Sequence, residues 1–153
     1  NSHMEMWETC TAELFGLASR NTRKLFPWEC RSLDEVLREM ADSGEGADME
    51  DPVDALCTDL PMKVLTNSRK THGAACILYP GVLDGMAQEM GSDFFILPSS
   101  IHEVILLPDT GYGDNEELKG MIREVNSAQV ALEEVLSDTL YRYDRADKRV
   151  VIV

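Results

Sequence analysis

The sequence predicts a single α+β domain, with an antiparallel sheet of about six strands, built from hairpins, and three to five helices packed on it. The length of 153 residues is that of one domain, and 44% hydrophobic residues can form a core. Short apolar runs alternate with turn residues, which is typical of hairpins. Two capping boxes, each just before an apolar periodic segment, indicate helices.

Residues 1–41 are predicted to be a helical segment that packs on the main body. Thr11 is placed to cap a helix running to about Phe26, where Pro27 stops it. A second helix begins after the capping box Ser32-Leu33-Asp34-Glu35, in which the serine oxygen and the glutamate satisfy free backbone N–H groups.

The next stretch, residues 42–60, is predicted to be an acidic loop or linker. From Asp42 to Asp59 there are seven acidic side chains and no Lys or Arg, which is half of the net charge of −14. Gly44, Gly46 and Pro52 break regular structure here. The spacing of acids that a calcium loop requires is absent, so calcium binding is not expected.

Residues 61–153 are predicted to be the α+β main body. Apolar periodicity predicts helices from Pro80 or Gly81 to Gly91 and, after a capping box at Asp114, through about Val125. A short helical turn is expected at Leu132–Leu136. The expected strands form three hairpins: Met62–Thr66 with Ala74–Tyr79, Phe94–Leu97 with His102–Leu107, and Thr139–Tyr143 with Arg149–Val153.

The composition excludes several function classes. A net charge of −14 argues against nucleic acid or an anionic membrane as partner, and it suits a protein partner with a basic surface. No apolar run approaches the roughly 18 residues of a membrane span, and no signal peptide is apparent. The four cysteines form no Cys-x-x-Cys pair, so we expect no metal or cofactor and free thiols in a reducing cytoplasm.

The most suggestive chemistry lies in the segment Pro98 to Glu103. Ser100 and His102 are two apart, so on a strand they face the same side, and Asp109 is near enough in sequence to be a third member of a triad. The Gly-x-Ser-x-Gly elbow is missing, however, and a turn whose serines bond to backbone explains the same residues.

A phosphate-binding loop at Gly111-Tyr112-Gly113 is disfavoured by the acidic residues that begin the following helix. Carboxylates there already occupy the positive end of the helix dipole and would repel a phosphate.

Long segments across nearly the whole chain resemble a family of uncharacterised bacterial proteins, found mainly in gut commensals and known only as a domain of unknown function. The segments include Pro27 to Cys30, His72 to Cys76, Ile96 to Pro108, Arg123 to Asn126 and Tyr141 to Tyr143. The resemblance implies that Asn1 to Met4 is native sequence and that the chain is the C-terminal portion of the family's proteins. It implies no activity, substrate or catalytic residue.

Three functions remain open at this point. The first is a cytoplasmic, non-enzymatic module that binds a protein partner, and the second is a small hydrolase that uses Ser100 and His102. The third is an acidic mimic of nucleic acid that occupies a basic groove. The sequence does not determine the oligomeric state.

Overall fold

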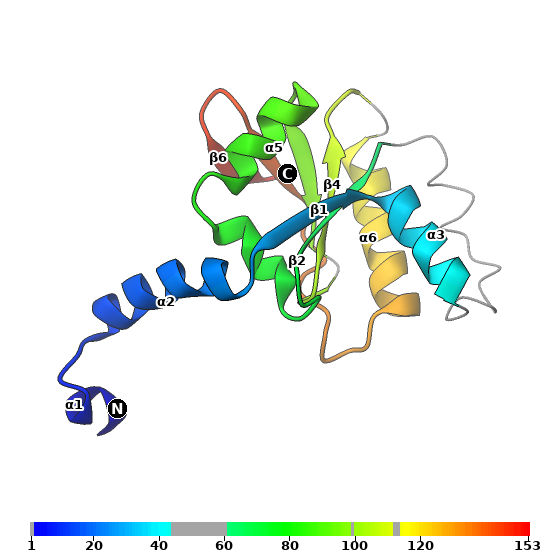
Figure 1. Ribbon diagram of the computed structural model, residues 1–153. Coiled ribbons are helices and arrows are strands. Elements are labelled where there is room, and N and C mark those ends of the chain that lie inside the picture. The colour runs from blue at the N-terminus through cyan, green and yellow to red at the C-terminus, as the bar shows by residue number, and fades with distance from the viewer. Residues whose placement is uncertain (1, 44–60, 99, 112–113) are drawn as a thin grey trace.

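The computed structural model describes residues 2–43, 61–98, 100–111 and 114–153. Six strands form one antiparallel sheet with the order β1-β2-β4-β3-β5-β6, which confirms the predicted α+β class (Figure 1). The strands are β1 Trp28–Ser32, β2 Lys63–Asn67, β3 Phe94–Leu97, β4 Val104–Pro108, β5 Tyr141–Asp144 and β6 Arg149–Ile152.

Helices lie on both faces of this sheet (Figure 1). The short 3-10 helix η1 and helix α5 cover one face, and α6 covers the other with α3 beside it. Helices α1 and α2 form an arm that projects from this body. The helices are α1 Ser2–Met6, α2 Thr11–Leu25, α3 Leu33–Ser43, η1 Gly73–Leu78, α5 Val82–Met90 and α6 Asn115–Gln129. Within the described ranges, none of these helices has the length and apolar character that a membrane span requires.

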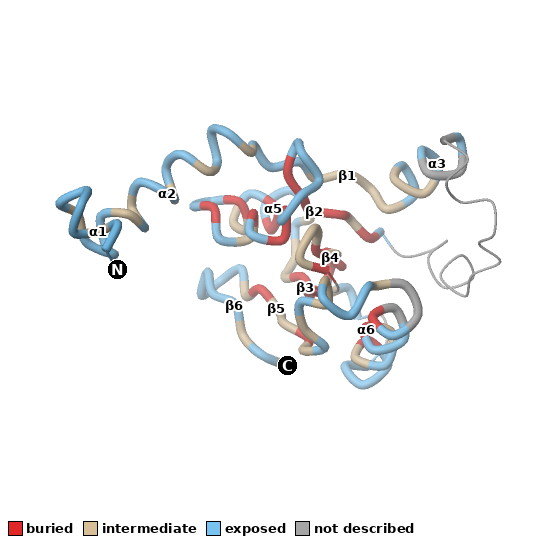
Figure 2. Tube along the Cα trace, turned by 90° about the horizontal axis from the view of Figure 1, so that it is seen from below, coloured by how far each residue is buried: buried red, intermediate tan, exposed pale blue. Residues whose placement is uncertain are grey.

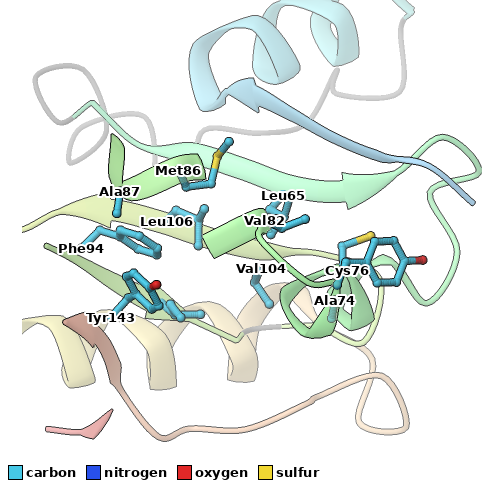
Figure 3. Close-up of a cluster of buried hydrophobic side chains, with 12 residues drawn as sticks. Leu65, Ala74, Cys76, Val82, Met86, Ala87, Phe94, Val104, Leu106 and Tyr143 are labelled. Atoms are coloured by element: carbon cyan, nitrogen blue, oxygen red, sulfur yellow. The ribbon is translucent and has the colours of Figure 1, made fainter. Parts of the chain in front are cut away.

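The core has one buried cluster on each face of the sheet. Strand β3 contributes to both, because alternate residues of a strand point to opposite faces: Phe94 lies in the cluster under η1 and α5, and Phe95 in the cluster under α6. Figure 3 shows the first cluster, in which the rings of Phe94 and Tyr143 stack with centroids 5.2 Å apart. Burial on both faces explains why this strand reads as a continuous apolar run.

The predicted capping boxes are confirmed. The Ser32 hydroxyl accepts the Glu35 N–H at 3.1 Å, and the Glu35 carboxylate accepts the Ser32 N–H in return. The Asp114 carboxylate accepts the N–H groups of Glu116 and Glu117, each at 2.9 Å. At α2, Cys10 rather than Thr11 is the residue before the first helical turn.

One predicted strand was wrong. Residues 74–79 do not pair with β2 as a hairpin; residues 73–78 form η1, and the strand that pairs with β2 on that side is β1. Both edges of β2 are paired, with β1 and with β4, so no edge is left for residues 74–79. At Gly73 the chain passes close to β2, because a Cβ there would lie 2.4 Å from the His102 carbonyl oxygen and 2.7 Å from the Asn67 nitrogen. Residues of η1 then pack on one face of the sheet.

The arm differs most from expectation. None of the 15 described residues of α2 is buried, and Figure 2 shows the arm without buried positions, so the expected packing on the body is not seen for this helix. Phe26 and Pro27 form the joint between α2 and β1, and two hydrogen bonds fix it to the body. The Phe26 carbonyl accepts the Tyr79 hydroxyl at 3.1 Å, and the Pro27 carbonyl accepts the Ser68 N–H at 2.9 Å. The guanidinium of Arg69 lies 5.8 Å from the centre of the Phe26 ring. This joint directs α2 away from the sheet (Figure 1).

Of the predicted linker at 42–60, residues 42 and 43 belong to α3, and residues 44–60 lie outside the described residues, as do Ser99, Tyr112 and Gly113. The acidic-mimic hypothesis and the Gly111-Tyr112-Gly113 loop depend on these positions and therefore stay predictions.

Candidate functional site

The turn between β3 and β4 holds Ser100 and His102, two of the three residues suggested for a triad. The Ser100 side chain is buried, and its hydroxyl oxygen accepts the backbone N–H of His102 at 2.8 Å. The two residues are therefore neighbours through the backbone of one turn. This is the arrangement of a serine that stabilises a tight turn.

The imidazole of His102 is engaged at both nitrogens. Its Nδ1 accepts the backbone N–H of His72 at 3.1 Å, and its Nε2 lies 3.2 Å from Oε1 of Glu134. Because Nδ1 is an acceptor, the proton of the neutral ring is on Nε2 and is donated to the carboxylate. The nitrogen that would act as a base is thus occupied by a backbone N–H.

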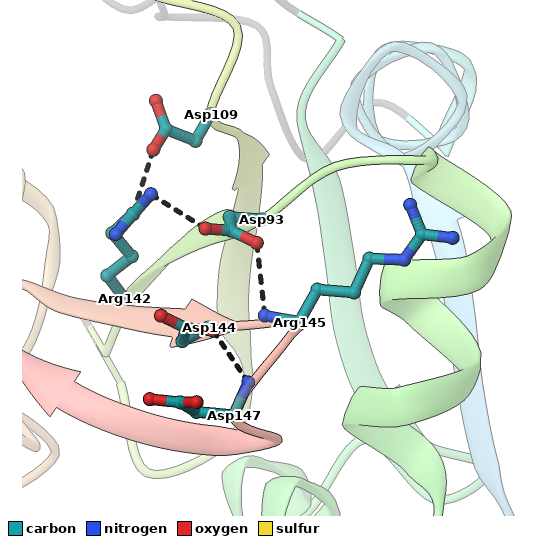
Figure 4. Close-up of polar contacts among 6 residues, drawn as sticks. All are labelled: Asp93, Asp109, Arg142, Asp144, Arg145 and Asp147. Carbon is teal, nitrogen blue, oxygen red and sulfur yellow. Dashed lines mark hydrogen bonds and ion pairs between the residues drawn. The ribbon is translucent and has the colours of Figure 1, made fainter.

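Asp109 lies at the other end of β4 and takes no part in this turn. Its Oδ2 accepts the Arg142 Nε at 2.8 Å, and the Arg142 Nη2 donates to Asp93 Oδ2 at 2.7 Å (Figure 4). The Asp93 carboxylate also accepts the backbone N–H of Arg145 at 3.0 Å. Arg142 therefore connects β5 with the ends of β3 and β4, and the described geometry does not bring Asp109 to His102.

The turn between β3 and β4 is hydrogen-bonded to the segment that follows α6. The backbone N–H of Ile101 donates to the Glu134 carbonyl at 2.9 Å, Ser100 bridges Val135, and the Ser137 N–H donates to the Pro98 carbonyl at 3.1 Å. The expected helical turn at 132–136 is present as hydrogen bonds from Glu134 and Val135 to the Ala131 carbonyl.

This segment presents what we name the leucine–acid strip: Leu132, Glu133, Leu136 and Asp138. Leu132 is 89% exposed and Leu136 is 43% exposed, and both acidic side chains are exposed. At this exposure Leu132 makes almost no contact with the body, so its apolar surface is available to a partner.

The second apolar surface belongs to the N-terminal arm, residues 2–25. Phe15 is 71% exposed, Leu25 is 66% exposed, and Trp7 at the turn between α1 and α2 is 60% exposed. A groove of about 790 Å³ is formed by the turn that holds Trp7 and by part of α2, including Leu17 and Arg20. Large apolar side chains gathered on one projecting element mark an interaction surface.

Metal and thiol chemistry receive no support within the described part of the chain. No group of three His, Cys, Asp or Glu side chains there could hold a metal ion. Cys10, Cys30 and Cys76 are free, and burial raises the pKa of the Cys30 thiol to about 11, which suppresses the reactive thiolate.

Sequence reasoning missed His72 and Glu134 as partners of His102. The contact between His102 and Glu134 spans 32 residues, and no local spacing predicts such a pairing. The Glu133-Glu134 pair inside an otherwise apolar turn was the available signal, but it did not indicate which segment the turn would contact.

Comparison with known proteins places the chain in a family without an assigned role. The profile of a family of unknown function, DUF5688, matches residues 1–145. No curated protein matches, and no solved structure matches. The expected family resemblance is therefore confirmed at this level. The bacterial gut-commensal source and the C-terminal position within longer proteins stay predictions.

Proposed function

Since the chain belongs to the DUF5688 family of unknown function, membership assigns no activity, and we propose that it is a non-enzymatic protein-interaction module of the bacterial cytoplasm whose N-terminal arm is the docking element. One observation carries the proposal: α2 is an amphipathic helix of 15 residues with no buried residue. A helix of this length is marginal in water by itself, and most helices in proteins are stabilised by packing of their apolar face.

The apolar side chains of α2 are therefore the part of the arm that gains most from a partner. Phe15, Leu17 and Leu25 are all at least 45% exposed. Each would contribute about 1.5–3 kcal/mol if fully buried, although association itself costs several kcal/mol. Leu17 and Leu25 lie on one side of the helix with Phe15 at its edge, and an interface centred on this side resembles the helix-in-groove mode of recognition.

The chain offers partners two kinds of charged surface. From Leu14 to Trp28 there are three basic side chains, Arg20, Arg23 and Lys24, and no acidic one. That leaves 11 of the 14 basic side chains against all 28 acidic ones in the rest of the chain. A basic partner surface therefore suits the body, whereas the second half of α2 suits an acidic one.

The test places a photo-crosslinking phenylalanine analogue at Phe15 in cells that express the chain. We expect a discrete protein adduct from position 15, and no adduct from the same analogue at Gln88, which is exposed on α5. The substitution Leu25→Asp, on the same helix, should abolish the adduct without unfolding the body. Equal labelling from both positions, or labelling that survives Leu25→Asp, would argue against the proposal.

A further inference from the structure

We infer that the partner of the arm is a second copy of this chain, and that α2 of each copy docks on the leucine–acid strip of the other. The inference rests on the proposed function and adds to it the identity of the partner. It follows from two described surfaces that are complementary in charge and in apolar character.

The arm contributes a basic amphipathic helix. Its exposed apolar side chains include Phe15, Leu17 and Leu25, and its second half carries Arg20, Arg23 and Lys24 without an acidic side chain. Such a helix requires a surface that offers apolar side chains and carboxylates together. A purely acidic surface would leave its leucines in water, and a purely apolar one would desolvate its cations.

The strip has this composition. Leu132 and Leu136 are separated by about one helical turn, and the exposed carboxylates of Glu133 and Asp138 lie beside them in sequence. The strip is also fixed in place by the hydrogen bonds of Ile101 and Ser137 and by the contact between His102 and Glu134. A docking surface held in one conformation loses less entropy on binding than a mobile one.

The contact has to be intermolecular. Both views show α2 projecting away from the body that carries the strip, with α1 at its far end (Figures 1 and 2). Reciprocal exchange of two arms uses both copies of each surface and closes as a two-fold dimer, whereas a one-way contact would close into a larger ring or continue as an open filament. The reciprocal arrangement predicts a dimer, and it predicts that any single substitution acts at two equivalent contacts.

The charge of the remaining surface favours this partner over a membrane. The second half of α2 is a basic region in a chain with net charge −14, and an anionic lipid surface that attracted Arg20, Arg23 and Lys24 would repel the acidic body. In the reciprocal dimer the basic half of each arm instead lies against acidic side chains of the other copy.

Sedimentation velocity on the full chain across a wide concentration range tests the inference. We expect a monomer–dimer equilibrium that Lys24→Glu and Glu133→Lys each weaken by about tenfold, through two modest charge contacts per dimer, because Lys24 lies on the same side of α2 as Leu17. The double variant Lys24→Glu/Glu133→Lys should regain most of the affinity, because it restores opposite charges in each contact. Arg149→Glu, a charge reversal of the same size at an exposed position on β6, serves as control and should leave the affinity unchanged.

Tryptophan emission gives a second readout, since the two tryptophans, Trp7 and Trp28, lie at the two ends of α2. Their emission should shift as the dimer dissociates. A monomer at every concentration, or a double variant no better than the single variants, overturns the inference. If the chain is monomeric while position 15 still gives an arm-dependent adduct with another protein, the inference fails and the proposed function stands. If neither the dimer nor the adduct from position 15 is found, the inference and the proposed function both fail. Arm-dependent binding to phosphatidylserine vesicles without a dimer would overturn the inference and assign α2 to a lipid surface.

Discussion

His102 and Glu134 meet across 32 residues of sequence, with Nε2 of the imidazole 3.2 Å from Oε1 of the carboxylate. The contact connects the turn before β4 to the segment after α6. The same ring accepts the His72 backbone N–H on its other side, so one side chain joins three separate parts of the chain. The residue that the sequence singled out for chemistry is, in the structure, the centre of a set of tertiary hydrogen bonds.

This arrangement predicts an ordered series of stabilities at position 102. His102→Ala should lower the free energy of unfolding by about 1–2 kcal/mol, because the His72 N–H loses its acceptor. His102→Asn should cost less, since its side-chain oxygen can replace Nδ1 as acceptor. Urea unfolding followed by circular dichroism measures both, and an Asn variant as unstable as the Ala variant would contradict the assignment.

The hydrolase hypothesis can be tested at Ser100. Because its hydroxyl oxygen accepts a backbone N–H and the His102 Nδ1 is occupied, we expect no hydrolysis that depends on this serine. The measurement is an esterase and peptidase screen of the wild type and Ser100→Ala, with circular dichroism to confirm that the variant is folded. Turnover by the wild type that disappears in the folded variant would establish the hydrolase instead.

Two glycines should respond in opposite directions to alanine. Gly73→Ala would bring a Cβ within 2.2 Å of Thr66 Oγ1 and 2.4 Å of the His102 carbonyl oxygen, so we expect a loss of about 3 kcal/mol or more. Gly85 lies in α5 with open space around it, and Gly85→Ala should add about 0.5–1 kcal/mol. Thermal unfolding compares the two variants directly. A Gly73→Ala variant as stable as the wild type would show that the chain passes less closely over β2.

The ion pairs of Arg142 should contribute more to the free energy of unfolding than the ion pairs at the surface. Its two carboxylate partners, Asp93 and Asp109, are each about a quarter exposed, and Arg142→Met leaves both without their cation, at a cost of about 1–3 kcal/mol. Arg149 is 65% exposed beside Asp147, and Arg149→Ala should cost less than about 0.5 kcal/mol. Equal effects in urea unfolding would mean that the contacts in Figure 4 are no stronger than surface pairs.

Thiol reactivity should separate Cys10 from Cys30. Burial is the largest cause that raises the pKa of Cys30 to about 11, with a smaller contribution from Glu89 against the opposing effect of Lys63. At pH 8.5 its thiolate is then below about 1%. Iodoacetamide and peptide mapping should label exposed Cys10 well before Cys30 in the native protein, and the difference should vanish in urea.

The same pKa gives a dependence of stability on pH. The pKa of Cys30 is higher in the folded state than in the unfolded chain, so the stability that depends on its protonated thiol is fully present below the unfolded pKa. As the pH rises toward 11, the unfolded chain ionises first and this part of the free energy of unfolding is lost. Equal labelling of Cys10 and Cys30 in the native state would contradict the burial of the Cys30 thiol that raises this pKa.

Much of the fold could be predicted from local pattern because the pattern has a local cause. Both capping boxes satisfy N–H groups within three residues, and the strands Phe94–Leu97 and Arg149–Ile152 lie where apolar runs end at turn residues. Strand β1 was missed because Trp28–Ser32 mixes an aromatic, two charges, a thiol and a hydroxyl, and β2 supplies its only regular partner among the described strands.

The candidate site was predicted in part only. Ser100 and His102 share a turn, as two residues so close in sequence must. The roles of His72, Glu134 and Asp109 depend on where distant segments lie on the sheet, and one sequence contains no measure of that placement. The exposure of Phe15 and Leu25 follows the same rule: their spacing predicts an apolar face, but the direction of α2 is decided at the joint with β1.

The joint at Phe26 and Pro27 also makes the arm a lever. Helix α2 has 15 residues and is therefore about 22 Å long, so a rotation of about 10° at its base moves the far end by about 4 Å. The base leads within two residues into β1, the outermost strand on its side of the sheet. Load applied at α1 would thus act as torque on the hydrogen-bond ladder between β1 and β2. That edge should open first when the molecule is pulled by its N-terminus.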